Sequence, residues 1–195
     1  ECLSSISRFD VQTNRLQMHV LSRGDERAVP IIFVHGNFSS SAYFDKLMQA
    51  LPDGYRALAI DLRGYGDTED KVIDASRGAG DWADDLHALV QAMDIPSAHW
   101  VGWSAGAAAI MQLAQDHPES VLSLTLVAPV SPRGFGGSRD VEGKACYQDH
   151  AGSGGGIVSP DFIRRVLMKD RSDDDPLSPR NVIQGAYFYK PVSTA

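Results

Sequence analysis

Four short, mainly apolar runs, separated by segments with helical periodicity, constrain the fold of this chain more than any other feature. The runs are residues 30–34, 55–60, 99–102 and 121–127. The first run is apolar at every position, which is typical of a strand covered on both faces, as parallel sheets require, and the other three are mainly apolar. A looser alternation over residues 8–22 predicts a hairpin ahead of the first run. The sequence therefore predicts an α/β fold, a mostly parallel sheet with flanking helices and right-handed crossovers.

The separators between the runs have the spacing of one helix face. Residues 41–51 and 81–93 each carry an apolar stripe, and residues 105–115 form a short, Ala-rich segment. Asp84 and Asp85 fall in the first turn of the second of these helices, where the helix dipole favours negative charge.

The amino-acid composition limits the classes of protein to which this chain can belong. The chain has 195 residues, 43% of them hydrophobic, with 25 Asp and Glu against 18 Lys and Arg and a net charge of −7. That length is enough for one full core. The acidic balance argues against nucleic acid or an anionic membrane surface as a partner. The longest apolar runs, about five residues, are far shorter than the roughly 20 that span a bilayer.

The amino-acid composition changes after residue 130. Residues 131–156 are rich in glycine and read as loop, and two short helices are predicted to start at Ser159-Pro160 and at Ser178-Pro179. No further core strand is visible before residue 195. Residues 1–130 are therefore expected to form a core and residues 131–195 a separate, loop-rich helical segment.

The third apolar run leads directly into Gly102-Trp103-Ser104-Ala105-Gly106, and the Ala-rich helix follows. This G-x-S-x-G pattern is informative in the order strand, sharp turn, helix. A serine on such a turn is held in a strained backbone conformation, and the flanking glycines relieve crowding. It also lies at a helix N-terminus, whose free N–H groups favour the negative charge that develops in acyl transfer.

Two further turns are predicted at the same edge of the sheet. His35-Gly36-Asn37-Phe38 closes the first apolar run, and a glycine-broken turn over residues 61–67 closes the second. The backbone N–H of Asn37, or alternatively of Phe38, is expected to pair with that of Ala105 as an oxyanion hole.

These three motifs, in this order, resemble the α/β-hydrolase family, and the resemblance covers residues 8–130. It implies a Ser-His-Asp/Glu triad, with Ser104 as nucleophile and Ala105 as second oxyanion donor. It also implies that residues 131–195 begin a cap or lid. The turn at Asn37 is similar to that of haloalkane dehalogenases, which use an aspartate nucleophile, and Ser104 argues against that chemistry.

The family reading predicts a serine hydrolase that cleaves an ester, lactone or related acyl bond of a small molecule. Phe38, Trp103, Tyr187 and Phe188 are predicted to line the substrate pocket. Carbon-carbon bond hydrolysis and acyl transfer would use the same residues and stay open. An alternative of another class is a non-catalytic receptor or pseudoenzyme that keeps the fold and pocket.

The histidine and acid of a triad are not placed by these motifs. None of the six histidines follows a late core strand, and His35 is predicted to brace its turn. Within the chain, His150 as base and Asp140 or Asp149 as acid remain candidates. The simplest expectation is a longer polypeptide whose remaining strands, acid and histidine lie beyond residue 195 or on a companion C-terminal chain, after a nick, a self-cleavage or a simple end. A nick in the cap is favoured, because a half sheet with an open edge aggregates.

No cofactor and no metal are predicted. The sequence has no phosphate-binding G-x-x-x-x-G-K-[ST] loop and no H-E-x-x-H pattern, and the run 152–156 follows no strand. The acidic run 173–175 is interpreted as a solvated turn.

Overall fold

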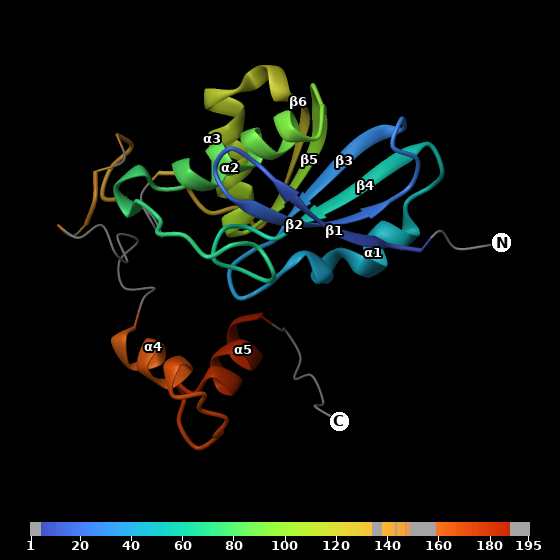
Figure 1. Ribbon diagram of the computed structural model, residues 1–195. Helices are drawn as coiled ribbons and strands as arrows, with labels where there is room; N and C mark the ends of the chain where they lie inside the picture. The colour runs from blue at the N-terminus through green and yellow to red at the C-terminus, as the bar shows by residue number, and fades with distance from the viewer. Residues whose placement is uncertain (1–4, 134–137, 143, 147, 149–158, 188–195) are drawn as a thin grey trace. The chain divides into compact units, whose positions relative to one another are not determined.

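The computed structural model describes residues 5–133, 138–142, 144–146, 148 and 159–187 (Figure 1). The chain divides into two compact units, residues 1–154 and residues 155–195. Within the described residues, no helix is both long and apolar enough to cross a membrane.

The first unit is built on one mixed sheet, with the described strands in the order β1-β2-β4-β3-β5-β6 (Figure 1). β1 pairs antiparallel with β2 and β2 with β4, whereas β4, β3, β5 and β6 are parallel. The predicted hairpin and the mostly parallel sheet are both confirmed. The strand bounds are β1 (Ser7–Gln12), β2 (Gln17–Arg23), β3 (Val29–Val34), β4 (Tyr55–Ile60), β5 (Ala98–Trp103) and β6 (Val121–Val127).

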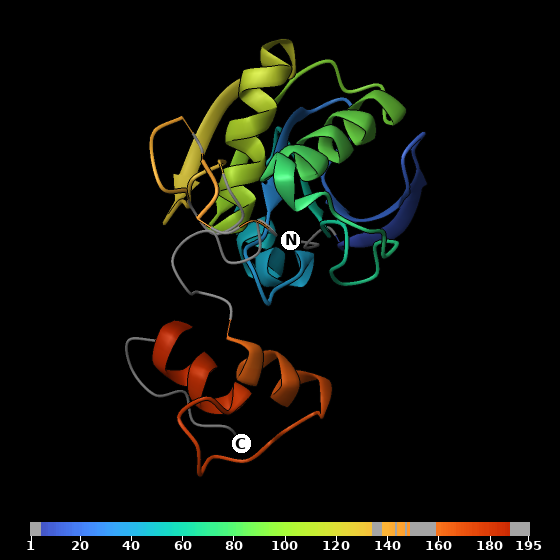
Figure 2. The same cartoon turned by 90° about the vertical axis from the view of Figure 1, so that its left-hand side faces the viewer.

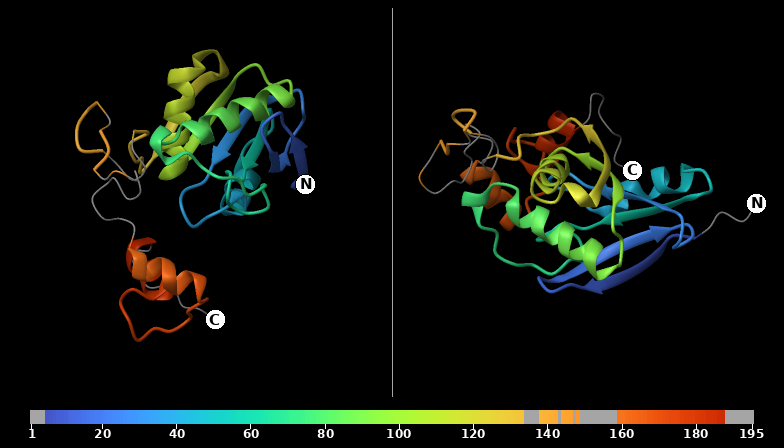
Figure 3. Two further views of the ribbon diagram at one scale, coloured as in Figure 1. Left: turned by 60° about the vertical axis from the view of Figure 1, so that its left-hand side comes forward. Right: turned by 90° about the horizontal axis from the view of Figure 1, so that it is seen from above.

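Helices flank the sheet on both faces. α2 and α3 cover one face and α1 the other (Figures 2 and 3). The helix predicted over residues 41–51 starts as a tighter 3-10 turn before it becomes α1. The bounds are η1 (Ser41–Phe44), α1 (Asp45–Ala50), η2 (Ala75–Arg77), α2 (Gly80–Ala92), α3 (Ala105–Asp116) and η3 (Pro118–Ser120).

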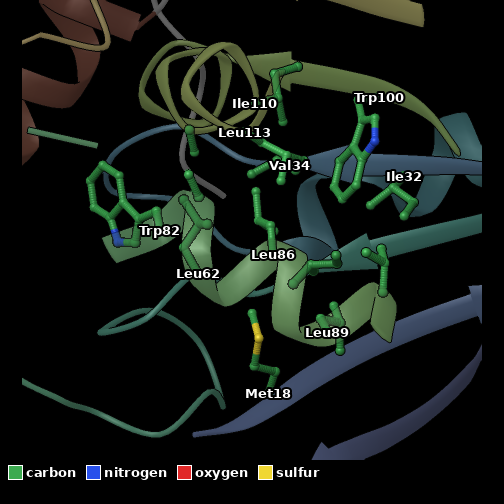
Figure 4. Close-up of a cluster of buried hydrophobic side chains, with 14 of the residues drawn as sticks. Met18, Ile32, Val34, Leu62, Trp82, Leu86, Leu89, Trp100, Ile110 and Leu113 are labelled. Atoms are coloured by element: carbon green, nitrogen blue, oxygen red, sulfur yellow. The ribbon is translucent and has the colours of Figure 1, made fainter. Parts of the chain in front are cut away.

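Alternation along β3 divides the core in two. Ile32 and Val34 point toward α2 and α3, and Phe33 points toward α1, where it packs on Phe44 with ring centroids 5.1 Å apart. The larger cluster, between the sheet and α2 and α3, is centred on fully buried Leu86 (Figure 4). Both faces of the central strands are therefore buried, as the apolar runs predict.

The prediction that Asp84 and Asp85 lie in the first turn is wrong, because α2 begins at Gly80 and Asp81 is the acidic residue there; Asp85 has another role. Its side chain is fully buried and accepts hydrogen bonds from Arg63 Nε at 2.8 Å and Nη2 at 2.7 Å, and from Arg15 Nε at 2.7 Å. These bonds tie α2 to the turn after β4 and to the β1–β2 turn. Because a buried carboxylate requires pairing, this network specifies how α2 docks on the sheet.

β6 departs from the expectation of a strand buried on both faces. Among the described strands it pairs with β5 alone, and Leu122, Leu126 and Val127 expose 52%, 39% and 46% of their surface. Its apolar sequence is that of an interior strand, but its position in the described sheet is that of an edge.

The second unit has two helices, as predicted, α4 (Pro160–Leu167) and α5 (Pro179–Tyr187). Ser159 Oγ accepts a hydrogen bond from the Phe162 N–H and caps α4. Arg165 pairs with Asp161, Asp170 and Asp175, and these pairs hold the connection between the helices to α4.

Candidate active site

Ser104 lies on a strained turn between β5 and α3. Its backbone has φ 54° and ψ −113°, a region that residues with a side chain rarely adopt. The glycines on either side allow this turn. A Cβ on Gly102 would lie 2.6 Å from Ala107 Cα, and one on Gly106 would lie 2.3 Å from the Val34 carbonyl oxygen. Both glycines therefore relieve crowding at the turn, as the sequence predicts.

The turn after β3 lies directly against this elbow. A Cβ built on Gly36 would be 3.0 Å from Ser104 Cβ and 3.1 Å from the Trp103 carbonyl oxygen. Together with the close approach of Gly106 to the end of β3, this contact places the Asn37 turn beside the N-terminus of α3. The first N–H groups of a helix have no acceptor within the helix. The N–H of Ala105, the first residue of α3, is therefore of the type that can donate to an oxyanion.

Side-chain hydrogen bonds hold the turn that carries Asn37 and Phe38. Phe38 adopts a left-handed φ of 53°, and its N–H donates to Asn37 Oδ1 at 3.1 Å. The same Oδ1 accepts from the Tyr65 hydroxyl at 2.5 Å. These two bonds hold the turn that carries both candidate oxyanion donors, Asn37 and Phe38.

His35 braces two turns, as the sequence predicts. Its Nδ1 lies 2.7 Å from the Gly36 carbonyl oxygen, and its Nε2 accepts from the Leu62 N–H at 3.1 Å. One ring nitrogen donates and the other accepts, so the ring is neutral. Burial lowers the pKa of His35, partly offset by its bond to Gly36 and by nearby Asp61.

Asp61 closes the turn after β4 in the same way. Its carboxylate accepts from the backbone N–H of Ser41 at 2.6 Å and of Asp67 at 2.9 Å. A Cβ on Gly66 would lie 1.9 Å from Asp61 Oδ2, which explains the glycine at that position of the turn. Both oxygens are thus engaged in holding backbone, and Asp61 is a structural carboxylate.

Aromatic side chains border the elbow. Trp103 stacks on Tyr43 with ring centroids 4.6 Å apart and planes 14° apart, and Phe38 and Tyr43 expose 51% and 62% of their surface. Phe38 and Trp103 are predicted pocket residues, whereas Tyr43 belongs to the apolar stripe over residues 41–51 and no sequence motif marks it as part of the site. The predicted pocket residues on the second unit, the side chain of Tyr187 and all of Phe188, lie outside the described residues.

The histidine and acid of a triad are not brought to Ser104 by the described residues. Burial is the main cause of the lowered pKa of His87, and the adjacent His117 ring lowers it further. Asp140 Oδ1 accepts from the Lys144 N–H at 3.0 Å, and His150 and Asp149 lie outside the described residues. The described histidines contact other groups: His19 with Asp10, His35 with Gly36, His87 with His117, and His99 with Ser123.

Comparison with known proteins places this geometry in a family. The alpha/beta hydrolase fold family matches residues 29–145. A 2-(acetamidomethylene)succinate hydrolase from Mesorhizobium japonicum is 32% identical over 117 residues, 60% of this chain and 41% of that protein. An epoxide hydrolase from Caballeronia sordidicola is 34% identical over 103 residues, 52% of this chain and 31% of that protein. The chain thus spans about two fifths or less of the length of these relatives.

Solved structures give the same result. An epoxide hydrolase from Vigna radiata superimposes with a TM-score of 0.57 at 30% identity, over 62% of this chain and 39% of that one. A haloalkane dehalogenase from Bradyrhizobium elkani superimposes with a TM-score of 0.60 at 29% identity, over 67% of this chain and 44% of that one.

Proposed function

Because the chain belongs to the alpha/beta hydrolase fold family, we propose that it supplies the nucleophile and oxyanion hole of a serine hydrolase acting on an ester, lactone or related acyl bond of a small molecule. One observation carries the proposal. Ser104 is held at φ 54° and ψ −113° at the N-terminus of α3, against the turn that ends β3. Backbone strain of this kind persists where the surrounding structure holds it, often at an active site.

The geometry supports acyl transfer in two steps. Ser104 Oγ attacks the carbonyl carbon of the substrate, and a histidine takes its proton. The carbonyl oxygen becomes an oxyanion between the N–H groups of Ala105 and Asn37, and its collapse expels the alcohol, which takes the proton back. Water then attacks the acyl-enzyme by the same route, which releases the acid and restores Ser104.

The identity of the nucleophile supports acyl chemistry over the other reactions for which relatives are named. The relatives are named for different reactions, among them an epoxide hydrolase and a haloalkane dehalogenase. The hydroxyl oxygen of a serine can attack a carbonyl carbon and take up the acyl group. The exposed rings of Phe38 and Tyr43 beside Trp103 suit an apolar group on the substrate.

The histidine and the acid are proposed to reside on a companion C-terminal segment that pairs with β6. Support comes from that strand, which exposes Leu122, Leu126 and Val127 although its sequence is that of an interior strand. An open apolar edge is a liability that native proteins cover. The segment from residue 131 onward is proposed to begin the cap.

Labelling with a fluorophosphonate tests the proposal. The natively purified protein is treated with the reagent and digested, and mass spectrometry locates the adduct. We expect phosphonylation of Ser104 and its loss in Ser104→Ala, since only an activated serine reacts quickly. His99→Gln, which alters a histidine bonded to Ser123, is the matched control and should label normally.

A non-catalytic receptor with the same fold is the second candidate, favoured by the lack of any described histidine bonded to Ser104. Denaturing mass spectrometry separates the two. A 21.1 kDa chain with a stoichiometric companion and a labelled Ser104 supports the hydrolase. An unlabelled Ser104 in the complete protein overturns it and supports the receptor.

A further inference from the structure

A cluster of metal-binding side chains lies at the end of α3 opposite Ser104. His87 on α2 and His117, just after α3, stack face to face with ring centroids 3.6 Å apart and planes 7° apart. His117 Nδ1 is 3.5 Å from Glu119 Oε1. One ligand atom from each of these three residues lies within 4.8 Å of the other two. Since α3 has 12 residues, about 18 Å of helix separates this cluster from Ser104.

We propose that His87, His117 and Glu119 form a binding site for a divalent transition metal ion of the Zn²⁺ type. Two imidazoles and a carboxylate are a ligand set that Zn²⁺ prefers, with metal-ligand bonds of roughly 2.0–2.2 Å. Ligand atoms around one tetrahedral ion then lie about 3–4 Å apart. Because the two rings are parallel, their nitrogen lone pairs do not yet converge, so binding requires the partly exposed His117 ring to turn until both nitrogens face the ion, and water takes the fourth position.

The surroundings fix the first ligand. His87 Nδ1 is 3.3 Å from Ser120 Oγ, and Ser120 is fully buried. Trp100 Nε1 donates to the Ser120 carbonyl oxygen at 3.0 Å, so the η3 turn is held from inside the core. A hydrogen bond from Nδ1 to the serine leaves Nε2 of His87 as the metal ligand. A partner of this kind orients a ligating histidine and raises affinity.

The site is open to ions. A cavity of about 520 Å³ is lined by His87 and His117 together with Thr13 and Asn14 of the β1–β2 turn. Glu119 is 64% exposed in its side chain. A hydrated cation can therefore reach the two histidines through the cavity and Glu119 from solvent, and exchange part of its water for them.

Bound metal would join α2 to the α3–β6 connection, so its effect is on stability. The purified protein is stripped with a chelator and its thermal unfolding is followed with and without ZnCl₂. At a free Zn²⁺ concentration about 100 times the Kd, we expect the Tm to rise by about 5–10 °C. Titration with Co²⁺ should give the visible absorption bands of a four-coordinate ion.

Single substitutions assign the ligands. His87→Asn, His117→Gln and Glu119→Gln should each weaken Zn²⁺ binding at least tenfold by calorimetry, and Ser120→Ala should weaken it about tenfold. His99→Gln is the matched control and should bind as the unsubstituted protein does. Glu119→Gln keeps the test decisive if a histidine variant does not fold, because its side chain is largely exposed. Absence of Zn²⁺ binding at 100 µM, or unchanged binding in Glu119→Gln and the folded histidine variants, overturns the proposal.

Discussion

Replacing Ser104 by glycine is expected to stabilise the protein while removing the proposed nucleophile. At φ 54° and ψ −113° a residue with a side chain carries strain of about 1–3 kcal/mol, and glycine carries almost none. Glycine also loses about 0.5–1 kcal/mol more backbone entropy on folding than alanine does. The balance leaves Ser104→Gly about 0.5–2 kcal/mol more stable than Ser104→Ala.

Urea unfolding, followed by tryptophan fluorescence, measures this difference. Both variants lack the hydroxyl, so the loss of that group does not contribute to the difference between their free energies of unfolding. The control pair is Gln112→Gly and Gln112→Ala within α3, where the glycine variant should be about 1 kcal/mol less stable. If Ser104→Gly is also less stable than Ser104→Ala, the elbow is not strained and the argument from its geometry fails.

Three other substitutions test the supports of the site. Gly106→Ala should lower the free energy of unfolding by about 3 kcal/mol, because its Cβ would lie 2.3 Å from a backbone oxygen of β3. Gly185 has open space around it, so Gly185→Ala should be neutral or slightly stabilising. If denaturant unfolding shows the same loss of stability in Gly106→Ala and Gly185→Ala, crowding at Gly106 is not the cause. Asp85→Ala should lower the free energy of unfolding by about 3–5 kcal/mol, because it leaves a buried arginine without its partner. Asp84 is more exposed, so Asp84→Ala should lower it by about 1 kcal/mol or less. Chemical denaturation should therefore rank Asp85→Ala well below Asp84→Ala. His35 has a pKa below 6.5 when folded, so the unfolded chain binds the proton more tightly and stability should fall as the pH drops from 6.5 toward that lower pKa. His35→Gln should flatten this part of the stability profile in thermal unfolding at pH 5–7.5, and an unchanged slope would exclude His35 as its source.

Part of the candidate site can be predicted from the sequence, because its central turn is formed by residues that are close together in the chain. Gly102, Ser104 and Gly106 are neighbours in the chain, and their strain and close contacts follow from a turn between one strand and one helix. The partners of the turn are not local. Tyr65 donates to Asn37 across 28 positions, and Tyr43 stacks on a tryptophan far along the chain. No periodicity in the sequence predicts such pairs.

The sequence by itself determined the order and type of the core elements, because continuous apolar runs and helical stripes report burial one element at a time. Tertiary structure alone decided the strand order, in which β4 lies between β2 and β3. That order carries His35 to the Leu62 N–H, docks Asp85 on Arg63, and stacks His87 on His117. These contacts join residues that crossovers bring together, and their energies depend on distance and burial, which only the folded chain defines.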